Sequence, residues 1–157
     1  MKPINLDELA EQFDCLFDEW KYYLNTSTGE IVELQTEYLN IAEELNENDD
    51  ISIYSDWEQD EIRVAIDVFE NWDDYVSIPD KFDIDKYSIM EEFSYNYHDN
   101  EVSTKLCSAI RGRGAFSRFK DTIIYFGIDD EWYAYKKAKL IEISRKWCES
   151  NQIPYSN

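Results

Sequence analysis

The four glycines of this 157-residue chain constrain its fold most strongly, because they are few and each falls where the backbone needs a turn. Gly29 lies between two runs rich in β-formers, 20–25 and 30–34, and can adopt the positive φ that a short hairpin loop requires. Gly112 and Gly114 separate two helical patterns near the C-terminus. The glycines therefore predict a β-hairpin early in the chain and tightly joined helices late in it.

Apolar residues at helical spacing predict helices on both sides of the hairpin. The expected helices span residues 6–19, 36–46, 56–71, 85–97, 101–111, 114–126 and 130–150. Ser55 and Glu58 form a capping box at the start of the third helix, whose apolar stripe is expected to bury Trp57 and Phe69. Gly127 is expected to end the sixth helix in a left-handed cap.

Residues 75–78 have the pattern of a strand that Pro79 ends. This strand is expected to join the hairpin, since three strands form a viable sheet where two are marginal. The predicted fold is therefore α+β: a small antiparallel sheet, made of a hairpin plus one strand, with helices and a helical C-terminal part. The length, with 43% hydrophobic and 16% aromatic residues, fits a single domain over residues 1–157.

The net charge of −20 is distributed unevenly along the chain. Residues 1–104 hold 5 Lys or Arg against 29 Asp or Glu, whereas residues 105–157 hold 10 against 6. We therefore expect an acidic α+β part followed by a basic helical part. The overall field repels phosphates, which disfavours nucleic acid and anionic membranes as partners, whereas a basic protein fits the acidic part.

The cysteines are three, and they lie far apart, which argues against a disulfide framework and against a C-x-x-C metal or redox motif. Residues 1–13 carry carboxylates where a secretory signal needs an apolar run, and no later stretch is apolar enough for a membrane helix. His98 is the only histidine, too few for a histidine-based metal centre. We expect a cytoplasmic protein with no metal and no cofactor.

The most specialised segment is residues 109–121, AIRGRGAFSRFKD, here named the RGRG joint. Its glycines allow a tight turn that exposes backbone N–H groups at the start of the next helix, an arrangement suited to a phosphate or carboxylate. The candidate anion site comprises Arg111, Gly112, Arg113, Gly114, Arg118 and Lys120. The segment contains neither a P-loop nor a dinucleotide fingerprint.

Two other interpretations of the joint are open. In the first, its arginines pair with acids of the N-terminal part and fasten the two parts together, a role that arises readily in an acidic protein. In the second, the joint is a helix-turn-helix that reads DNA, which the net charge disfavours. Phe116, Phe119, Ile123 and Phe126 share one helical stripe and are expected in the core.

The joint also carries a family resemblance. Together with WYAYKK at 132–137 and RKWCESNQI at 145–153, it resembles the hallmark of Uncharacterised Protein Family 0158, a group of small acidic bacterial proteins. The similarity continues upstream through the expected hairpin, the YVSIP strand and the YSIMEEF helix, so it spans nearly the whole chain. It implies a cytoplasmic bacterial protein of one domain and transfers no catalytic residues.

Two positions depart from the pattern that the resemblance implies. Ser117 stands where relatives often carry Arg, and Tyr135 stands where they often carry Phe. The first departure removes one charge from the candidate anion site.

Taken together, these features favour binding over catalysis. The leading hypothesis is an interaction or regulatory protein that presents an acidic face to a basic protein, while the joint stabilises the fold or holds a phosphate-bearing small molecule. A sharper version is an immunity or antitoxin protein that mimics nucleic acid and blocks a basic nuclease or toxin. The alternative is an enzyme acting on a phosphorylated small molecule or nucleotide, with Arg111, Arg113 and Arg118 clamping the phosphate.

Overall fold

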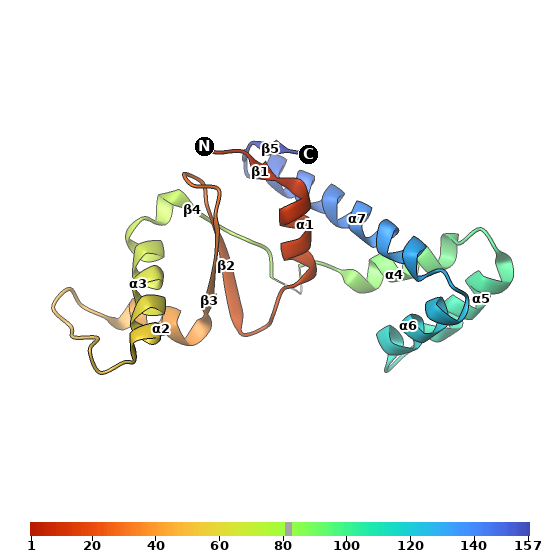
Figure 1. Ribbon diagram of the computed structural model, residues 1–157, viewed down its shortest axis with the longest axis horizontal. Coiled ribbons are helices and arrows are strands. Elements are labelled where there is room, and N and C mark those ends of the chain that lie inside the picture. The colour runs from red at the N-terminus through yellow and green to blue at the C-terminus, as the bar shows by residue number, and fades with distance from the viewer. Residues whose placement is uncertain (81–82) are drawn as a thin grey trace.

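The computed structural model describes residues 1–80 and 83–157, and its elements form three groups along the long axis of the molecule (Figure 1). The elements are β1 (Ile4–Asn5), α1 (Leu6–Asp14), β2 (Trp20–Asn25), β3 (Ile31–Gln35), α2 (Thr36–Glu44), α3 (Asp56–Glu70), the 3₁₀ turn η1 (Trp72–Asp74), β4 (Tyr75–Ser77), α4 (Lys86–Asn96), α5 (Asn100–Ala109), α6 (Ala115–Tyr125), α7 (Asp129–Ser150) and β5 (Tyr155–Ser156). An N-terminal lobe holds β2, β3, β4, α2 and α3, and a helical lobe holds α4, α5 and α6. Between them α1 lies beside α7, and the fold is α+β, as the sequence predicts.

The three-stranded sheet has the order β3-β2-β4, with both strand pairs antiparallel. The predicted hairpin and its third strand are therefore confirmed. The loop between β2 and β3 forms because the Asn25 side-chain oxygen accepts hydrogen bonds from the N–H groups of Ser27 and Thr28, while Gly29 has a φ of +76°. These local interactions are encoded within a few residues, which is why the sequence was sufficient to predict them.

A second sheet joins the two ends of the chain. β1 and β5 are parallel, with Ile4 opposite Tyr155 and Asn5 opposite Ser156. Figure 1 shows the two termini at the top of the molecule, one at each end of the β1 and β5 pair. This pair was not predicted, since two-residue strands are too short to show an alternating pattern.

The helix starts follow the predicted signals, but the first helix is shorter than expected. The Ser55 and Glu58 capping box is present, and Gly127, with a φ of +65°, follows the end of α6. The first helix ends at Asp14 and not at residue 19. The chain leaves the helix because the N–H of Phe17 donates to the hydroxyl of Tyr22 and the next residues turn into β2.

The buried side chains form two clusters. The larger one runs from the α1 and α7 pair into the helical lobe, and its fully buried members include Leu9, Phe13, Met90, Leu106 and Leu140. The smaller one lies in the N-terminal lobe under α2 and α3 and contains Leu34, Leu39, Ala42, Ala65, Val68 and Tyr75. The N-terminal lobe therefore has a core of its own.

Three aromatic side chains predicted to be buried are exposed. Trp57 is 59% exposed, Phe69 40% and Phe116 55%. Val68 is buried in α3 where the helical pattern pointed to Phe69, whereas Phe119 is buried as expected. The error has a simple cause: periodicity identifies the apolar side of a helix, but the neighbouring elements decide how much of that side they cover.

Candidate functional site

The RGRG joint connects α5 to α6 by the tight turn that its glycines predicted. α5 ends at Ala109 and α6 begins at Ala115, and Gly112 and Gly114 have φ values of +72° and +75°. Gly114 is the N-cap residue of α6, and no side chain caps this helix end.

The side chain of Arg118 turns back over the joint and binds its backbone. Its Nε–H donates to the carbonyl of Ala109 at 2.9 Å, and its two terminal nitrogens donate to the carbonyls of Arg113 and Arg111. The planar fork of a guanidinium suits this multiple contact. Arg118 therefore holds the joint closed and has only its remaining N–H groups to offer an anion.

The other basic residues of the joint are exposed, and within residues 1–80 and 83–157 none of them is ion-paired: Arg111, Arg113 and Lys120. The expected pairing of joint arginines with N-terminal acids is thus not seen among the described residues. Lysines of α7 make such pairs instead, with Lys137 reaching Asp7 at 3.5 Å. Binding of an anion by the six candidate residues stays a prediction.

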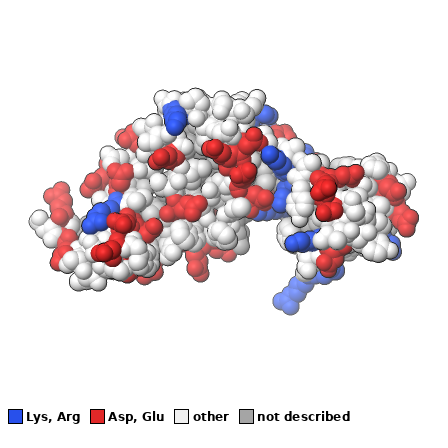
Figure 2. Space-filling view, viewed as in Figure 1, with Lys and Arg blue, Asp and Glu red and all other residues white. Residues whose placement is uncertain are grey.

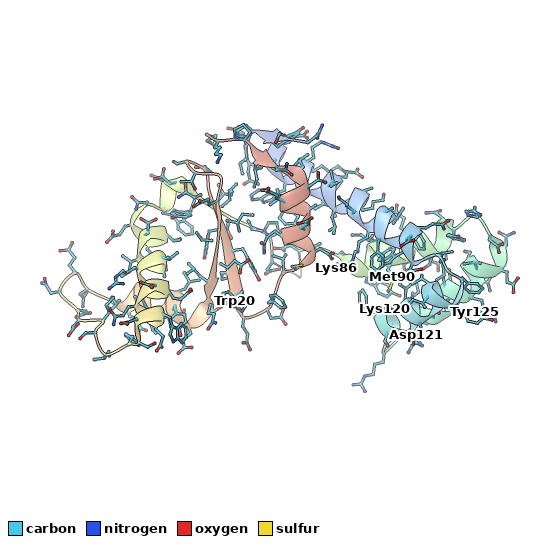
Figure 3. All side chains as sticks on the ribbon, in the orientation of Figure 1. Trp20, Lys86, Met90, Lys120, Asp121 and Tyr125 are labelled. Atoms are coloured by element: carbon cyan, nitrogen blue, oxygen red, sulfur yellow. The ribbon has the colours of Figure 1, made fainter. Side chains whose placement is uncertain are left out.

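A second basic site, here named the lysine pocket, is a hollow of about 290 Å³ beside α6 and α7. Its charged residues are Lys86, Lys120, Lys136 and Asp14, and its apolar and aromatic residues are Phe116, Phe119, Ile123, Trp132 and Tyr133. Figure 3 shows Lys86 at the start of α4 and Lys120 on the neighbouring α6. Of the predicted anion-site residues, Lys120 lines this pocket.

Asp14 organises one side of the lysine pocket. Its two carboxylate oxygens lie 3.1 Å from the Nζ atoms of Lys86 and Lys136, and Lys86 also donates to the Asp14 carbonyl at the end of α1. Burial favours a higher pKa for Asp14, but the hydrogen bonds and charges of the two lysines outweigh it and hold that pKa below its ordinary value. The carboxylate therefore remains ionised and joins α1, α4 and α7.

A third site, here named the acidic groove, is a hollow of about 440 Å³ between α2, the following loop and the C-terminal half of α3. Its apolar residues are Ala42, Leu45, Ile51, Ile66 and Phe69, and its acidic residues are Glu43, Glu47, Asp49 and Glu70. None of the described residues that line it is Lys or Arg. Figure 2 shows acidic side chains spread over this left-hand lobe.

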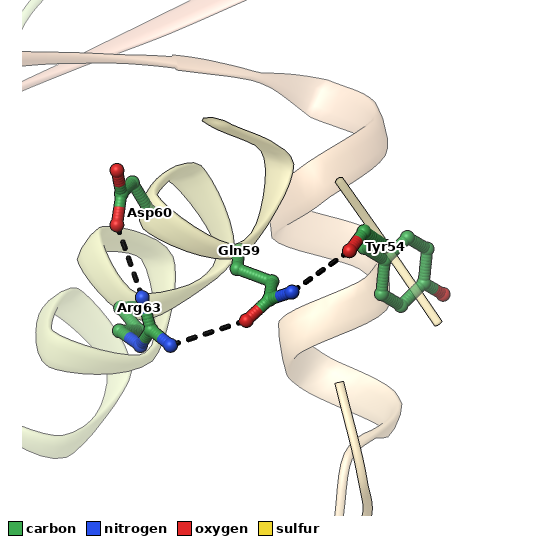
Figure 4. A network of polar contacts seen from close by, with 4 residues as sticks. All are labelled: Tyr54, Gln59, Asp60 and Arg63. Atoms are coloured by element: carbon green, nitrogen blue, oxygen red, sulfur yellow. Dashed lines mark hydrogen bonds and ion pairs between the residues drawn. The ribbon is translucent and has the colours of Figure 1, made fainter. Parts of the chain in front are cut away.

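The segment 36–74, which includes α2 and α3, contains a single basic residue, Arg63, and fourteen acids. Arg63 donates to Asp60 at 3.0 Å and to Gln59 at 3.2 Å, both on its own helix (Figure 4). Gln59 in turn donates to the carbonyl of Tyr54 at 2.8 Å and so fixes the loop to α3. The one basic residue of the segment 36–74 is therefore engaged in a local network.

Sequence reasoning found the acidic character of the N-terminal part but missed the groove and the lysine pocket. A count of charged residues within 36–74 would have located the strongest excess of acid, whereas the exposure of Phe69 beside it is visible only in the structure. Lys86 and Lys136 are fifty residues apart in sequence, and no motif links them. Their convergence on Asp14 depends on how α1, α4 and α7 pack.

Residues 1–80 and 83–157 contain neither a cluster of metal ligands nor a membrane-spanning helix. No group of three or more His, Cys, Asp or Glu side chains there is arranged to hold a metal ion. No helix among them combines the length and apolar character needed to cross a membrane.

Comparison with known proteins identifies the family of this chain. Residues 1–156 match the model of an Uncharacterised protein family (UPF0158). No curated protein and no solved structure matches the chain.

Proposed function

Because the chain belongs to Uncharacterised protein family (UPF0158), whose name states no activity, we propose from the geometry that it is a protein-binding module that receives a basic partner in the acidic groove. The partner segment has lysines or arginines on one side and apolar side chains on the other. The observation that carries the proposal is an apolar hollow at which the charged lining residues that the structure describes are all acidic.

Charge complementarity supports a basic partner. The segment 36–74 has a net charge of −13, and its Arg63 is bound to neighbours on α3. Such a field attracts a cationic segment and repels an anionic one, which raises the association rate and sets specificity more than it sets affinity. The acids therefore select the class of partner.

Exposed apolar side chains support a protein and not a small cation. Phe69 is 40% exposed within the groove, and Ile53, in the loop between α2 and α3, is 81% exposed. Large apolar side chains that a partner can desolvate contribute most of the affinity in protein interfaces, and a groove between helices commonly receives an amphipathic helix. The groove combines this apolar contact with its acidic lining.

An immunity or antitoxin protein is one form of this proposal. Its partner would be a basic nuclease or toxin, and the carboxylates of the N-terminal lobe would occupy the surface that otherwise meets phosphates. The density of acids between residues 36 and 74 supports this form. A cytoplasmic setting is also part of the proposal, supported by three cysteines that carry free thiols.

The test uses a fluorescent amphipathic helical peptide with leucines on one face and lysines on the other. A second peptide, with glutamates in place of the lysines, serves as the charge control. Fluorescence anisotropy is expected to show binding of the lysine peptide only, with weaker affinity as salt shortens the Debye length from about 10 Å at 0.1 M to about 3 Å at 1 M. Equal binding of both peptides would contradict the proposed selectivity.

Matched variants distinguish the groove from the general charge of the protein. The triple variant Glu43→Gln, Glu47→Gln, Glu70→Gln is expected to weaken binding about tenfold, which corresponds to about 1.4 kcal/mol. The control triple Glu30→Gln, Glu33→Gln, Asp73→Asn removes equal charge from the same lobe outside the groove. Equal losses in the two triples would reject the groove as the binding site.

Two alanine variants test the contribution of an aromatic ring to peptide binding. Phe69→Ala removes an exposed ring of the groove, and Tyr125→Ala removes a ring on α6 that is 83% exposed. Both variants are expected to fold, since neither ring is buried. Phe69→Ala is expected to weaken peptide binding, and Tyr125→Ala is expected to leave it unchanged.

A further inference from the structure

The lysine pocket concentrates positive charge in a protein whose net charge is −20. Among the described residues, three ammonium groups and one carboxylate line it, which leaves an excess of two positive charges. Figure 2 shows Lys and Arg side chains gathered where the centre of the molecule meets the right-hand helical lobe. Charges of one sign that converge on a hollow with apolar walls attract a counter-ion into it.

A neighbouring hollow shows that this excess is specific to the lysine pocket. The two hollows share Asp14, Tyr133 and Lys136, but the neighbour is also lined by Asp7, Glu11 and Lys137, so its acids outnumber its lysines. An anion is therefore attracted to the side that holds Lys86 and Lys120.

The lysines retain donors for a ligand. Lys136 gives one hydrogen bond to Asp14, and its Nζ lies 5.4 Å from the ring centre of Tyr133. Within the part of the chain that the structure describes, Lys120 has no ion-pair partner. All three of its N–H groups are thus available to an oxyanion.

The walls of the pocket suit a flat ring. Phe116 is 55% exposed and Tyr133 is 46% exposed, although both line a hollow whose deeper wall contains the buried Trp132. Phe116 makes a T-shaped contact with Tyr87, with ring centres 6.4 Å apart, and its 55% exposure leaves ring surface for a ligand. Exposed aromatic rings next to cations are the elements that hold an aromatic anion by stacking and charge.

We propose that the lysine pocket binds a small ligand that carries both a phosphate and an aromatic ring, such as an aryl phosphate or a nucleoside monophosphate. Lys120 and Lys136 bind the phosphate, and Phe116 and Tyr133 contact the ring. A volume of about 290 Å³ is at the lower end of the range of small-molecule sites in proteins. This site is separate from the acidic groove and does not depend on the function proposed for that groove.

The test is a calorimetric titration of the full chain with phenyl phosphate, AMP, inorganic phosphate and phenol. Phenyl phosphate is expected to bind at least tenfold more tightly than either inorganic phosphate or phenol, because inorganic phosphate lacks the aromatic ring and phenol lacks the phosphate. Additional binding of AMP would identify nucleotides as the ligand class, whereas phenyl phosphate alone would restrict the site to smaller rings. Absence of phenyl phosphate binding at millimolar concentration, or equal binding of inorganic phosphate, would overturn the proposal.

Variants locate the binding in the pocket. Lys120→Ala is expected to weaken phenyl phosphate binding at least tenfold, and Lys120→Gln, which keeps most of the aliphatic stem, gives the same loss. The control Lys105→Ala removes an exposed lysine of α5 and is expected to change the affinity less than twofold. Equal losses for Lys120→Ala and Lys105→Ala would show that general charge, and not the pocket, attracts the ligand.

The ring requirement has its own pair of variants. Phe116→Ala is expected to reduce the preference for phenyl phosphate over inorganic phosphate, whereas Tyr125→Ala, on the same helix, leaves it intact. Phe69→Ala in the acidic groove serves as a further control and leaves phenyl phosphate binding unchanged. Failure of this inference is therefore distinguishable from failure of the proposed peptide binding.

Discussion

The Nε–H of Arg118 donates to the carbonyl of Ala109 at 2.9 Å and so connects the first turns of α6 to the end of α5. The terminal nitrogens of the same guanidinium bind the carbonyls of Arg111 and Arg113. Arg118 thus stabilises the backbone of the RGRG joint in which it lies. This contact separates the structural role of the joint from any ligand that the neighbouring basic residues bind.

Arg118→Ala is expected to destabilise the protein by about 1 kcal/mol, because three carbonyls of the joint lose a charged donor that water only partly replaces. Arg118→Lys recovers only part of this loss, since one ammonium cannot reproduce the planar fork. Urea unfolding measures both variants. Arg111→Ala is the control and is expected to stay within about 0.5 kcal/mol of wild type; an equal loss there would contradict the special role of Arg118.

Gly114→Ala is expected to destabilise the protein more than Gly112→Ala. Both residues have positive φ, which costs an alanine about 1 kcal/mol. At Gly114 the added Cβ would also lie 3.0 Å from Nη1 of Arg118, whereas at Gly112 it would meet nothing within 4 Å. Thermal unfolding of both variants, alone and combined with Arg118→Ala, measures the difference. A difference that persists without the Arg118 side chain would refute this explanation.

Asp14→Asn is expected to destabilise the protein by about 1 to 2 kcal/mol at neutral pH, because Lys86 and Lys136 lose their shared partner. The folded state lowers the pKa of Asp14, so this stabilisation is present above the unfolded pKa and is lost as the pH falls through the lower folded pKa. Wild type and variant are therefore expected to converge in acid.

Urea unfolding at a series of pH values tests this convergence. Asp7→Asn is the matched control, since Asp7 pairs with Lys137 at 3.5 Å and both side chains are more than half exposed. That variant is expected to change stability by less than about 0.5 kcal/mol. A loss for Asp14→Asn that stayed constant down to the lowest pH would mean that the ion pairs are not its cause.

The three cysteines are expected to differ in reactivity. Burial, aided by the charge of Glu149, raises the pKa of the Cys148 thiol to about 11, and its side chain is fully buried in α7. Cys15 is exposed. Iodoacetamide at mildly alkaline pH is expected to alkylate Cys15 in the native protein and Cys148 only after unfolding, because the thiolate is the reactive form. Mass spectrometry of peptides measures both, and early alkylation of Cys148 would show that α7 opens locally.

The sequence determined the features that depend on neighbouring residues. The Asn25 to Gly29 loop, the Ser55 and Glu58 cap and the left-handed glycines of the RGRG joint each arise from contacts within a few positions. Such contacts form with little dependence on the rest of the fold. They were sufficient to predict the hairpin, most helices and the α+β class.

The tertiary structure alone decided which surfaces are covered and which distant residues meet. Trp57, Phe69 and Phe116 have the spacing of core residues, but no neighbouring element covers them fully. The parallel β1 and β5 pair and the contact of Lys86 and Lys136 with Asp14 join residues from opposite parts of the chain. The spacing of apolar residues identifies the apolar face of a single helix or strand. Burial and ion pairing depend on how the helices and strands pack, and packing is a property of the whole chain.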